Sequence, residues 1–111
     1  MKDRTTALGI PRRVKAAVAE RDSVEGWPCC ILCGRPSPTR SPLAFSCAHY
    51  ISRARGGLGI EENILTLCWD CHQEYDGDRR RELRPILARH LREHYDGWDE
   101  NDLTYQKEGQ E

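Results

Sequence analysis

The stretch CAHYISRARGGLGIEENILTLCWDCHQEY spans residues 47–75 and ends in a Cys-x-x-Cys pair, Cys68 and Cys71, followed directly by a histidine. A second pair, Cys30 and Cys33, lies upstream in the run CILC. Two such pairs supply four thiolates, which form the ligand set of a closed tetrahedral zinc site. The sequence therefore predicts a structural Zn²⁺ that joins two distant parts of a short chain.

The 111 residues leave room for one domain with a modest core, since 38% are hydrophobic and 7% aromatic. A metal that cross-links the chain is a common source of stability at this size. Six cysteines could also pair as disulfides in a secreted protein, but the polar N-terminus does not look like a leader. We therefore expect metal ligation in a reducing cytoplasm. No apolar run reaches the ~20 residues of a membrane span, so no membrane partner is expected.

The charge of the chain is unevenly distributed. The whole sequence has a formal net charge of −1, with 17 basic and 18 acidic residues. Residues 93–111 hold seven acids and one lysine, so the first 92 residues carry a balance of +5. Fourteen of the 17 bases are arginines, whose planar guanidinium suits two-point contacts with phosphate oxygens. This distribution fits a nucleic-acid partner, although a solvated surface with an acidic tail explains it about as well.

Residues 1–9 are expected to be flexible, and a short amphipathic helix is expected from Pro11 to about Asp22. Proline suits the first turn of a helix, and the apolar side chains around it follow the i, i+3, i+4 spacing of one face. Packing against the zinc module is the commoner role of such a helix, and contact with a phosphate backbone is the alternative. The apolar face consists of Ile10, Val14, Ala17 and Val18.

The first cysteine pair, Cys30 and Cys33, is followed by Gly34, a pattern typical of a zinc knuckle. The glycine permits the turn that points backbone amides at the thiolates. Cys29 is then surplus and is expected to be a small buried residue, while a register in which it replaces Cys30 stays open. Residues 35–42, RPSPTRSP, are expected to form a loop because they hold three prolines and two serines.

Two short strands are expected on either side of a loop rich in arginine and glycine. Apolar residues alternate from Phe45 to Ile51, with His49 on the same side, and a second apolar run covers Ile64 to Cys68. A lone histidine in such a strand is usually a packed core residue. Three glycines within four positions of the loop allow its backbone to approach a phosphate. The other loop residues of chemical interest are Arg53, Arg55 and Asn63.

A helix carrying Cys71, His72 and Tyr75 is expected after the second strand. Placing His72 next to a zinc ligand fixes its backbone. Strand, loop, strand and helix in this order would bring His49 and His72 to opposite sides of one small cleft. The predicted fold class is therefore α+β, with a small zinc-stapled domain over residues 10–78.

The order of two Cys-x-x-Cys pairs, a histidine, Gly-Gly, an asparagine and Cys-His resembles the HNH endonuclease family over roughly residues 10–76. The resemblance implies a ββα-metal fold with a four-cysteine zinc, here with flanking N-terminal and C-terminal helices. It also implies hydrolysis of DNA phosphodiester bonds with one catalytic divalent ion, Mg²⁺, Mn²⁺ or similar. The run GGLGIEENILTLC and the helix-rich tail look like small phage and prophage members, which implies terminase or other packaging proteins as partners.

The resemblance also implies a role for each residue that matches the motif. His49 corresponds to the general base that takes a proton from the attacking water. Asn63 corresponds to the asparagine that ligates the catalytic ion or orients the base, and His72 corresponds to the histidine that ligates this ion. Arg53 and Arg55 are expected to hold a neighbouring phosphate. The structural zinc ligands correspond to Cys30, Cys33, Cys68 and Cys71.

Ala48 is a departure from the family pattern. Many members carry Asp or His immediately before the general base as a further metal ligand, and alanine can ligate nothing. The catalytic ion would then be held by fewer protein groups and bound less tightly. An alternative function is therefore a catalytically weak or inactive zinc-stabilised module for nucleic-acid binding or assembly, which needs the four cysteines alone.

A C-terminal helical extension packed on the domain is expected over residues 79–105, followed by a flexible tail at 106–111. Pro85 is expected to mark the start of the regular helix or a kink in it. His90 and His94 are four residues apart, which is ligand spacing for a metal, but they also align with the apolar face, and packing is favoured. That face consists of Leu83, Ile86, Leu87, His90, Leu91, His94 and Tyr95.

Overall fold

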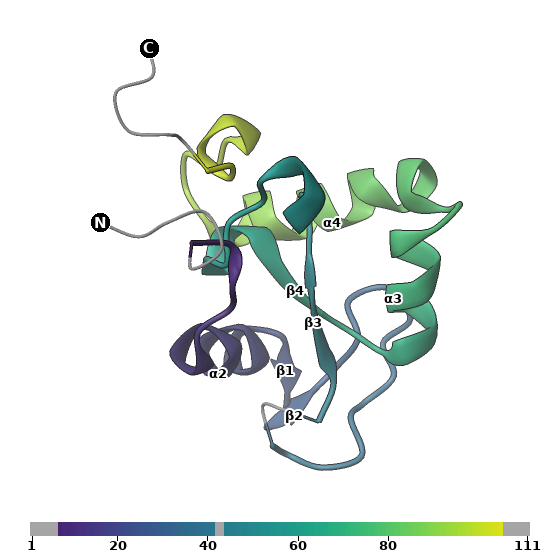
Figure 1. The fold of residues 1–111 in the computed structure, drawn as a ribbon. Helices are drawn as coiled ribbons and strands as arrows, with labels where there is room; N and C mark the ends of the chain where they lie inside the picture. The colour runs from purple at the N-terminus through teal and green to yellow at the C-terminus, as the bar shows by residue number, and fades with distance from the viewer. Residues whose placement is uncertain (1–6, 42–43, 106–111) are drawn as a thin grey trace.

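A hairpin of two antiparallel strands lies at the centre of the molecule. The computed structural model describes residues 7–41 and 44–105. Strand β3 (Ser46–His49) pairs with β4 (Ile64–Leu67), and helix α3 (Trp69–Asp76) follows β4 directly (Figure 1). This is the expected order of strand, loop, strand and helix, so the α+β fold class is confirmed.

Both faces of the β3–β4 hairpin are covered. Ala48 lies opposite Leu65, and both are fully buried in the main core together with Tyr50. On the other face His49 lies opposite Ile64, and the two cross-strand neighbours share that side of the sheet. The alternation of apolar residues had suggested that the side of the sheet with His49 is the core side. It does not identify the core because helices cover the hairpin on both sides.

Helix α2 (Arg12–Arg21) covers the second face of the hairpin (Figure 1). Val14 and Val18 pack against Ile64 of β4 in a smaller apolar cluster. The expected helix is thus present within one residue of its predicted bounds, with Pro11 before it and Asp22 after it. Two short strands, β1 (Ser23–Val24) and β2 (Trp27–Pro28), form a hairpin that leads to the first cysteine pair.

Helix α4 (Arg80–His94) covers the main core from the other side, as the predicted C-terminal extension requires. Leu83, Leu87 and Leu91 are buried on it, whereas Ile86 is 50% exposed. Ile86 therefore does not belong to the packed face, because the buried stripe is narrower than the apolar pattern suggested. Pro85 lies inside the helix, and the regular part begins five residues before it.

The described segments at both ends of the chain pack on the loop between β3 and β4. Of the expected flexible N-terminus, residues 1–6 lie outside the described part, while Leu8 is buried with 2% exposure. Near the C-terminus, Leu103 is 1% exposed, and its carbonyl accepts a hydrogen bond from Leu58 at 2.8 Å. The predicted tail at 106–111 lies outside the described residues. No helix in the described part has the length and apolar character required to cross a membrane.

Asp22 forms a buried polar centre between α2, β4 and α4. Its carboxylate accepts hydrogen bonds from Arg21 at 2.7 and 2.8 Å, from His90 at 2.9 Å and from the Thr66 amide at 3.0 Å. Burial by itself raises the pKa of Asp22, but the bonds from His90 and Arg21, the Arg21 charge and the Thr66 amide outweigh it and lower the pKa to about 2. His90 is thus a packing residue. Nδ1 of His94 donates to the His90 carbonyl of the same helix at 2.9 Å.

We predict that Asp22→Asn lowers the free energy of unfolding by roughly 3–5 kcal/mol, because it leaves the buried Arg21 guanidinium without a counter-charge. The side chains of Arg21 and Asp22 are only 8% and 0% exposed, so water cannot replace the lost partner. Urea unfolding of the zinc-loaded protein measures the change. Asp78→Asn, in an exposed turn, is the matched control. Equal stability of the two variants would show that the buried pair contributes little.

Candidate metal centre and histidine cleft

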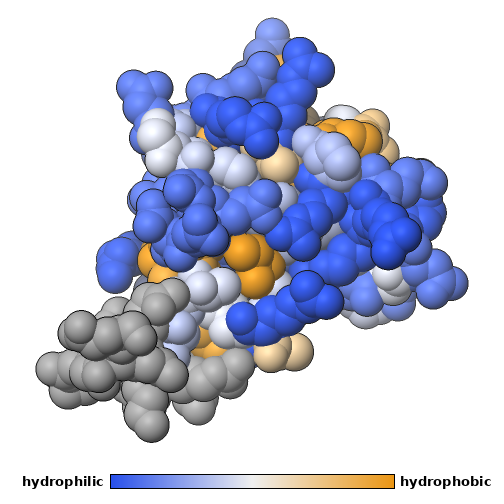
Figure 2. All heavy atoms as spheres, turned by 90° about the horizontal axis from the view of Figure 1, so that it is seen from above, coloured by the Kyte–Doolittle hydropathy of each residue, from blue (hydrophilic) through white to orange (hydrophobic). Residues whose placement is uncertain are grey.

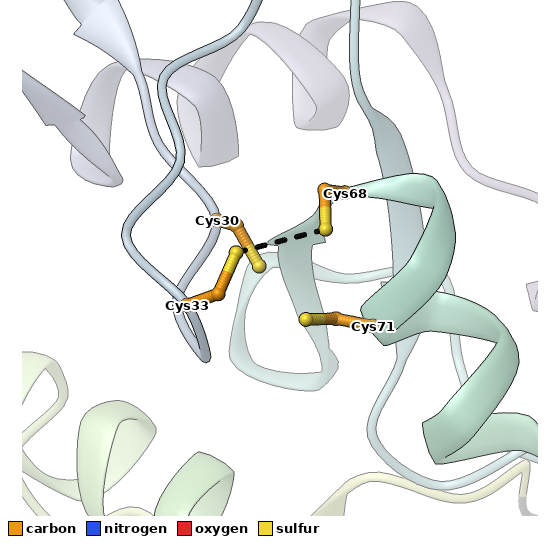
Figure 3. Close-up of side chains that lie close together, drawn as sticks. All are labelled: Cys30, Cys33, Cys68 and Cys71. Carbon is orange, nitrogen blue, oxygen red and sulfur yellow. Dashed lines mark hydrogen bonds between the residues drawn. The ribbon is translucent and has the colours of Figure 1, made fainter.

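The four paired cysteines converge on one point. Cys30 and Cys33 come from the loop after β2, and Cys68 and Cys71 come from the start of α3 (Figure 3). Their four sulfur atoms all lie within 4.8 Å of one another, and the sulfurs of Cys33 and Cys68 are 3.7 Å apart. A zinc–sulfur tetrahedron with bonds of about 2.3 Å has edges of about 3.8 Å. The arrangement therefore fits a tetrahedral zinc ion.

Backbone hydrogen bonds place the two cysteine pairs. The Ile31 amide donates to the Thr66 carbonyl at 3.0 Å, which ties the first pair to β4. Gly34 adopts φ +77°, a left-handed conformation that closes the turn, and its amide donates to the Cys30 carbonyl at 2.9 Å. Cys68 directly follows β4 and is the N-cap of α3. The strand and the helix start therefore fix the second pair.

The chemistry of the thiols also fits a cation. Burial raises the pKa of Cys30 and Cys71, and the neighbouring sulfurs raise that of Cys71 further. The amide of Arg35 lowers the pKa of Cys33. Sulfurs this close carry negative charge together only when a cation lies between them. Cys29 and Cys47 are outside this cluster, so the register with Cys30 as ligand is the one the fold supports.

We predict that Cys68→Ser abolishes zinc binding and unfolds or strongly destabilises the domain, because structural zinc contributes folding free energy directly. Zinc content and circular dichroism of the purified protein measure the two effects. Cys29→Ser is the matched control and should retain one zinc ion per chain, since the Cys29 sulfur lies outside the cluster and contacts the Trp27 carbonyl. Loss of zinc from Cys29→Ser would instead assign that residue to the site.

A second feature, named here the histidine cleft, opens beside β3. It has a volume of about 640 Å³, and His49 of β3 and His72 of α3 both line it. The two histidines are far apart in the chain and meet only in the fold. Their neighbours in the lining are Ile10, Cys47, Ser52, Arg53, Ala54, Arg55, Asp76 and Arg80. The cleft therefore combines imidazoles, one carboxylate and three guanidinium groups.

His49 is held in one tautomer. Its Nε2 lies 2.9 Å from the Leu8 carbonyl, which can only accept, so Nε2 carries the proton and Nδ1 keeps its lone pair. Burial is the main cause that lowers the pKa of His49 from its usual 6.5, and the charge of Arg53 adds to this effect. The imidazole is thus neutral near physiological pH and can accept a proton.

His72 is oriented by Ser46 and faces Asp76. The Ser46 hydroxyl donates to the Leu67 carbonyl at 3.0 Å, so it accepts from Nδ1 of His72 at 2.7 Å. The lone pair of His72 is therefore on Nε2, which lies 3.1 Å from a carboxylate oxygen of Asp76. A nitrogen and a carboxylate oxygen are a suitable partial ligand set for a divalent ion.

Asn63 does not reach the cleft. It is fully buried, and its Oδ1 accepts from the Ile51 amide at 2.8 Å. Its Nδ2 donates to the carbonyls of Ile51 and Leu58 at 3.2 and 2.8 Å. Both amide hydrogens and the oxygen are thus bonded to backbone groups. The side chain is therefore not placed to ligate the catalytic ion or to orient the base, which were its expected roles. Asn63 instead holds the two ends of the loop that carries Arg53 and Arg55.

The glycines of this loop also pack against the chain itself. A Cβ atom at Gly57 would lie 1.7 Å from the Ile51 carbonyl oxygen, so no larger residue fits there. The turn Arg53–Arg55 is a 3₁₀ helix, and both arginines line the histidine cleft. The expected positions of Arg53 and Arg55 next to the site thus agree with the structure. The glycines of this loop were expected to let its backbone approach a phosphate. In the structure they let the loop pack closely against the backbone of the chain itself.

Fold and geometry define a small ββα domain with a four-cysteine metal centre and an adjoining cleft that holds two histidines. Residues 30–76 match the model of the family described as HNH endonuclease, so the family resemblance is confirmed over this segment. A comparison with curated proteins found no match. The family match suggests nuclease activity and a divalent metal ion.

Sequence reasoning missed two groups in the site. Asp76 follows His72 at i+4 on α3, and this spacing alone could have identified it as a partner of the histidine. The Leu8 carbonyl contacts His49 across 41 positions and belongs to a segment without any motif. Only the folded chain reveals that interaction.

Proposed function

We propose that the chain is a metal-dependent endonuclease that hydrolyses phosphodiester bonds of DNA. The supporting observation is that a neutral imidazole, a histidine–carboxylate pair and three arginines line one cleft. Hydrolysis of a phosphodiester requires a base for water, positive charge beside the phosphoryl oxygens and stabilisation of the leaving oxygen. The histidine cleft supplies a base and positive charge, and a divalent ion bound there would stabilise the leaving oxygen.

In this proposal His49 is the general base. Its Nδ1 takes the proton of the attacking water, while the Leu8 carbonyl holds the proton on Nε2 and fixes the ring. The lowered pKa keeps the imidazole ready to accept a proton near neutral pH. Asn63 acts as a positioning residue for the loop beside it.

In the same proposal His72 and Asp76 hold the catalytic divalent ion, Mg²⁺, Mn²⁺ or similar. When bound, this ion neutralises the phosphoryl charge and stabilises the leaving oxygen. Ala48 is fully buried and offers no ligand, so the carboxylate of Asp76 takes the place of the protein ligand that is missing there. Arg53, Arg55 and Arg80 contact phosphate oxygens at the rim of the cleft.

We predict that His49→Ala lowers the rate of metal-dependent plasmid cleavage by about 10²–10⁴-fold, the usual contribution of a general base. Gel analysis of plasmid nicking with Mg²⁺ or Mn²⁺ measures this rate. Zinc content should be unchanged because His49 is not among the four clustered ligands. His94→Ala, on the exposed side of α4, is the matched control. Cleavage that persists in His49→Ala would remove this histidine from the reaction.

We predict that Asp76→Asn raises the divalent-ion concentration needed for half-maximal cleavage by about tenfold or more, because an amide binds a divalent cation less strongly than a carboxylate does. A titration of Mn²⁺ against cleavage rate measures the shift. Asp78→Asn serves as the control, since Asp78 lies two residues further along the chain and outside the cleft lining. The same metal dependence in both variants would exclude Asp76 as a ligand.

A second candidate is a catalytically weak or inactive zinc-stabilised module for nucleic-acid binding or assembly. Ala48 favours it, because it offers no ligand at a position that often supplies one in this family. Zinc-loaded protein that binds DNA but never cuts it would support this candidate.

A link to phage packaging proteins and a cytoplasmic location remain predictions. The reduced thiols of the metal centre suit a reducing compartment.

A further inference from the structure

A second hollow, named here the arginine groove, continues from the histidine cleft over helix α4. It has a volume of about 590 Å³ and shares Arg55 and Arg80 with the cleft. Five of its lining residues are arginines, against one carboxylate. These charged residues are Arg55, Arg80, Arg81, Arg84, Arg92 and Glu100.

The arginines of α4 form a line along the helix. Arg81, Arg84 and Arg92 occupy positions i, i+3 and i+11, so all three border the groove from one side of the helix. The rise from Arg81 to Arg92 is roughly 16 Å at about 1.5 Å per residue. One strand of a DNA duplex carries a phosphate every ~3.4 Å of axis, so this distance spans roughly five phosphates. Figure 2 shows that the face seen from above is mostly hydrophilic, with small apolar areas between.

Several of these guanidinium groups are fixed before any ligand binds. Arg84 donates to the Tyr50 hydroxyl at 3.0 Å and pairs with Glu100. Arg80 donates to the Tyr50 carbonyl at 2.9 Å, and Arg92 lies over the Trp98 ring at 5.8 Å. A guanidinium held in place loses less conformational freedom when it meets a phosphate.

We propose that the arginine groove binds the backbone of duplex DNA next to the bond cleaved in the histidine cleft. This inference rests on the proposed function and extends it to α4, which lies outside the segment that matches the family model. Within the described part of the chain, the groove offers no aromatic face for the base stacking that single-strand binding requires. Tyr50 is 1% exposed, and the Trp98 ring faces Arg92. Charge without a stacking surface fits phosphate contacts on a duplex.

The test uses equilibrium binding of a short fluorescent duplex, measured by anisotropy over a salt series without added divalent ion, in the His49→Ala background. Arg81→Gln/Arg92→Gln should weaken binding at least tenfold and reduce the slope of log K against log salt by about two, one for each phosphate that is no longer neutralised. Arg89→Gln is the matched control, because Arg89 is exposed on the same helix and outside the groove lining. Thermal unfolding confirms that each variant is folded. If the double variant does not fold, Arg81→Gln alone replaces it in the binding measurement.

Duplex binding by the double variant that equals that of Arg89→Gln would overturn the proposal. A loss of binding seen with a single strand of the same sequence, but not with the duplex, would overturn it as well. Glu100→Gln provides an opposite test, because it removes the one carboxylate that lines the groove while Arg84 keeps its hydrogen bond to the Tyr50 hydroxyl, and it should tighten duplex binding several-fold. Weaker binding by a folded Glu100→Gln protein would contradict the groove. If the groove substitutions weaken binding but the wild-type protein never cleaves DNA, only the proposed nuclease function is refuted. If cleavage is unchanged by the groove substitutions, only the proposed role of the arginine groove is refuted.

Discussion

The convergence of four cysteine sulfurs is the constraint on which the rest of this structure depends. One pair lies in a loop after a two-residue strand, and the other lies at the junction of β4 and α3. Ile31 and Leu32 of this loop are only partly buried against the main core, and the Ile31–Thr66 hydrogen bond is worth only about 1 kcal/mol. A structural zinc ion binds far more strongly than that. A zinc ion held by the four sulfurs would therefore fix the start of α3 relative to the loop after β2.

The position of α3 in turn sets the geometry of the histidine cleft. Cys71 and His72 are neighbours on the first turn of this helix, and Asp76 lies one turn further on. Any rotation of α3 that moved the Cys71 sulfur from the cluster would also move the imidazole away from Ser46 and β3. The four-cysteine cluster and the histidine cleft are thus positioned by the same helix of eight residues. Asn63 fixes another part of the histidine cleft, because its hydrogen bonds hold the loop that carries Arg53 and Arg55.

Much of this arrangement could be predicted from local sequence signals, and the remainder depends on contacts between distant segments. The cysteine spacing predicted the cluster, and periodicity predicted the helix after Pro11 and both central strands. Periodicity failed at the hairpin face, because helices cover both sides, and at Ile86, where a narrow stripe of leucines suffices for packing. The role of Asn63 could not be read from a motif, since its three backbone partners are defined only by the loop fold. The hydrogen-bonded centre around Asp22 could not be predicted from sequence either, because it joins Arg21, Thr66 and His90 across 68 positions.

The separate locations of the acidic and basic residues explain how a chain of net charge −1 can carry a basic surface. Acidic residues are concentrated after position 92, whereas four of the five arginines of α4 line the groove that adjoins the cleft. Arg80 belongs to both hollows and is fixed by the Tyr50 carbonyl, so a phosphate held there is placed relative to both. A patch of like charge at the point of contact can attract a polyanion even when the net charge of the whole chain is close to zero. In the proposed function, helix α4 outside the family segment would add phosphate contacts to those of the small ββα unit.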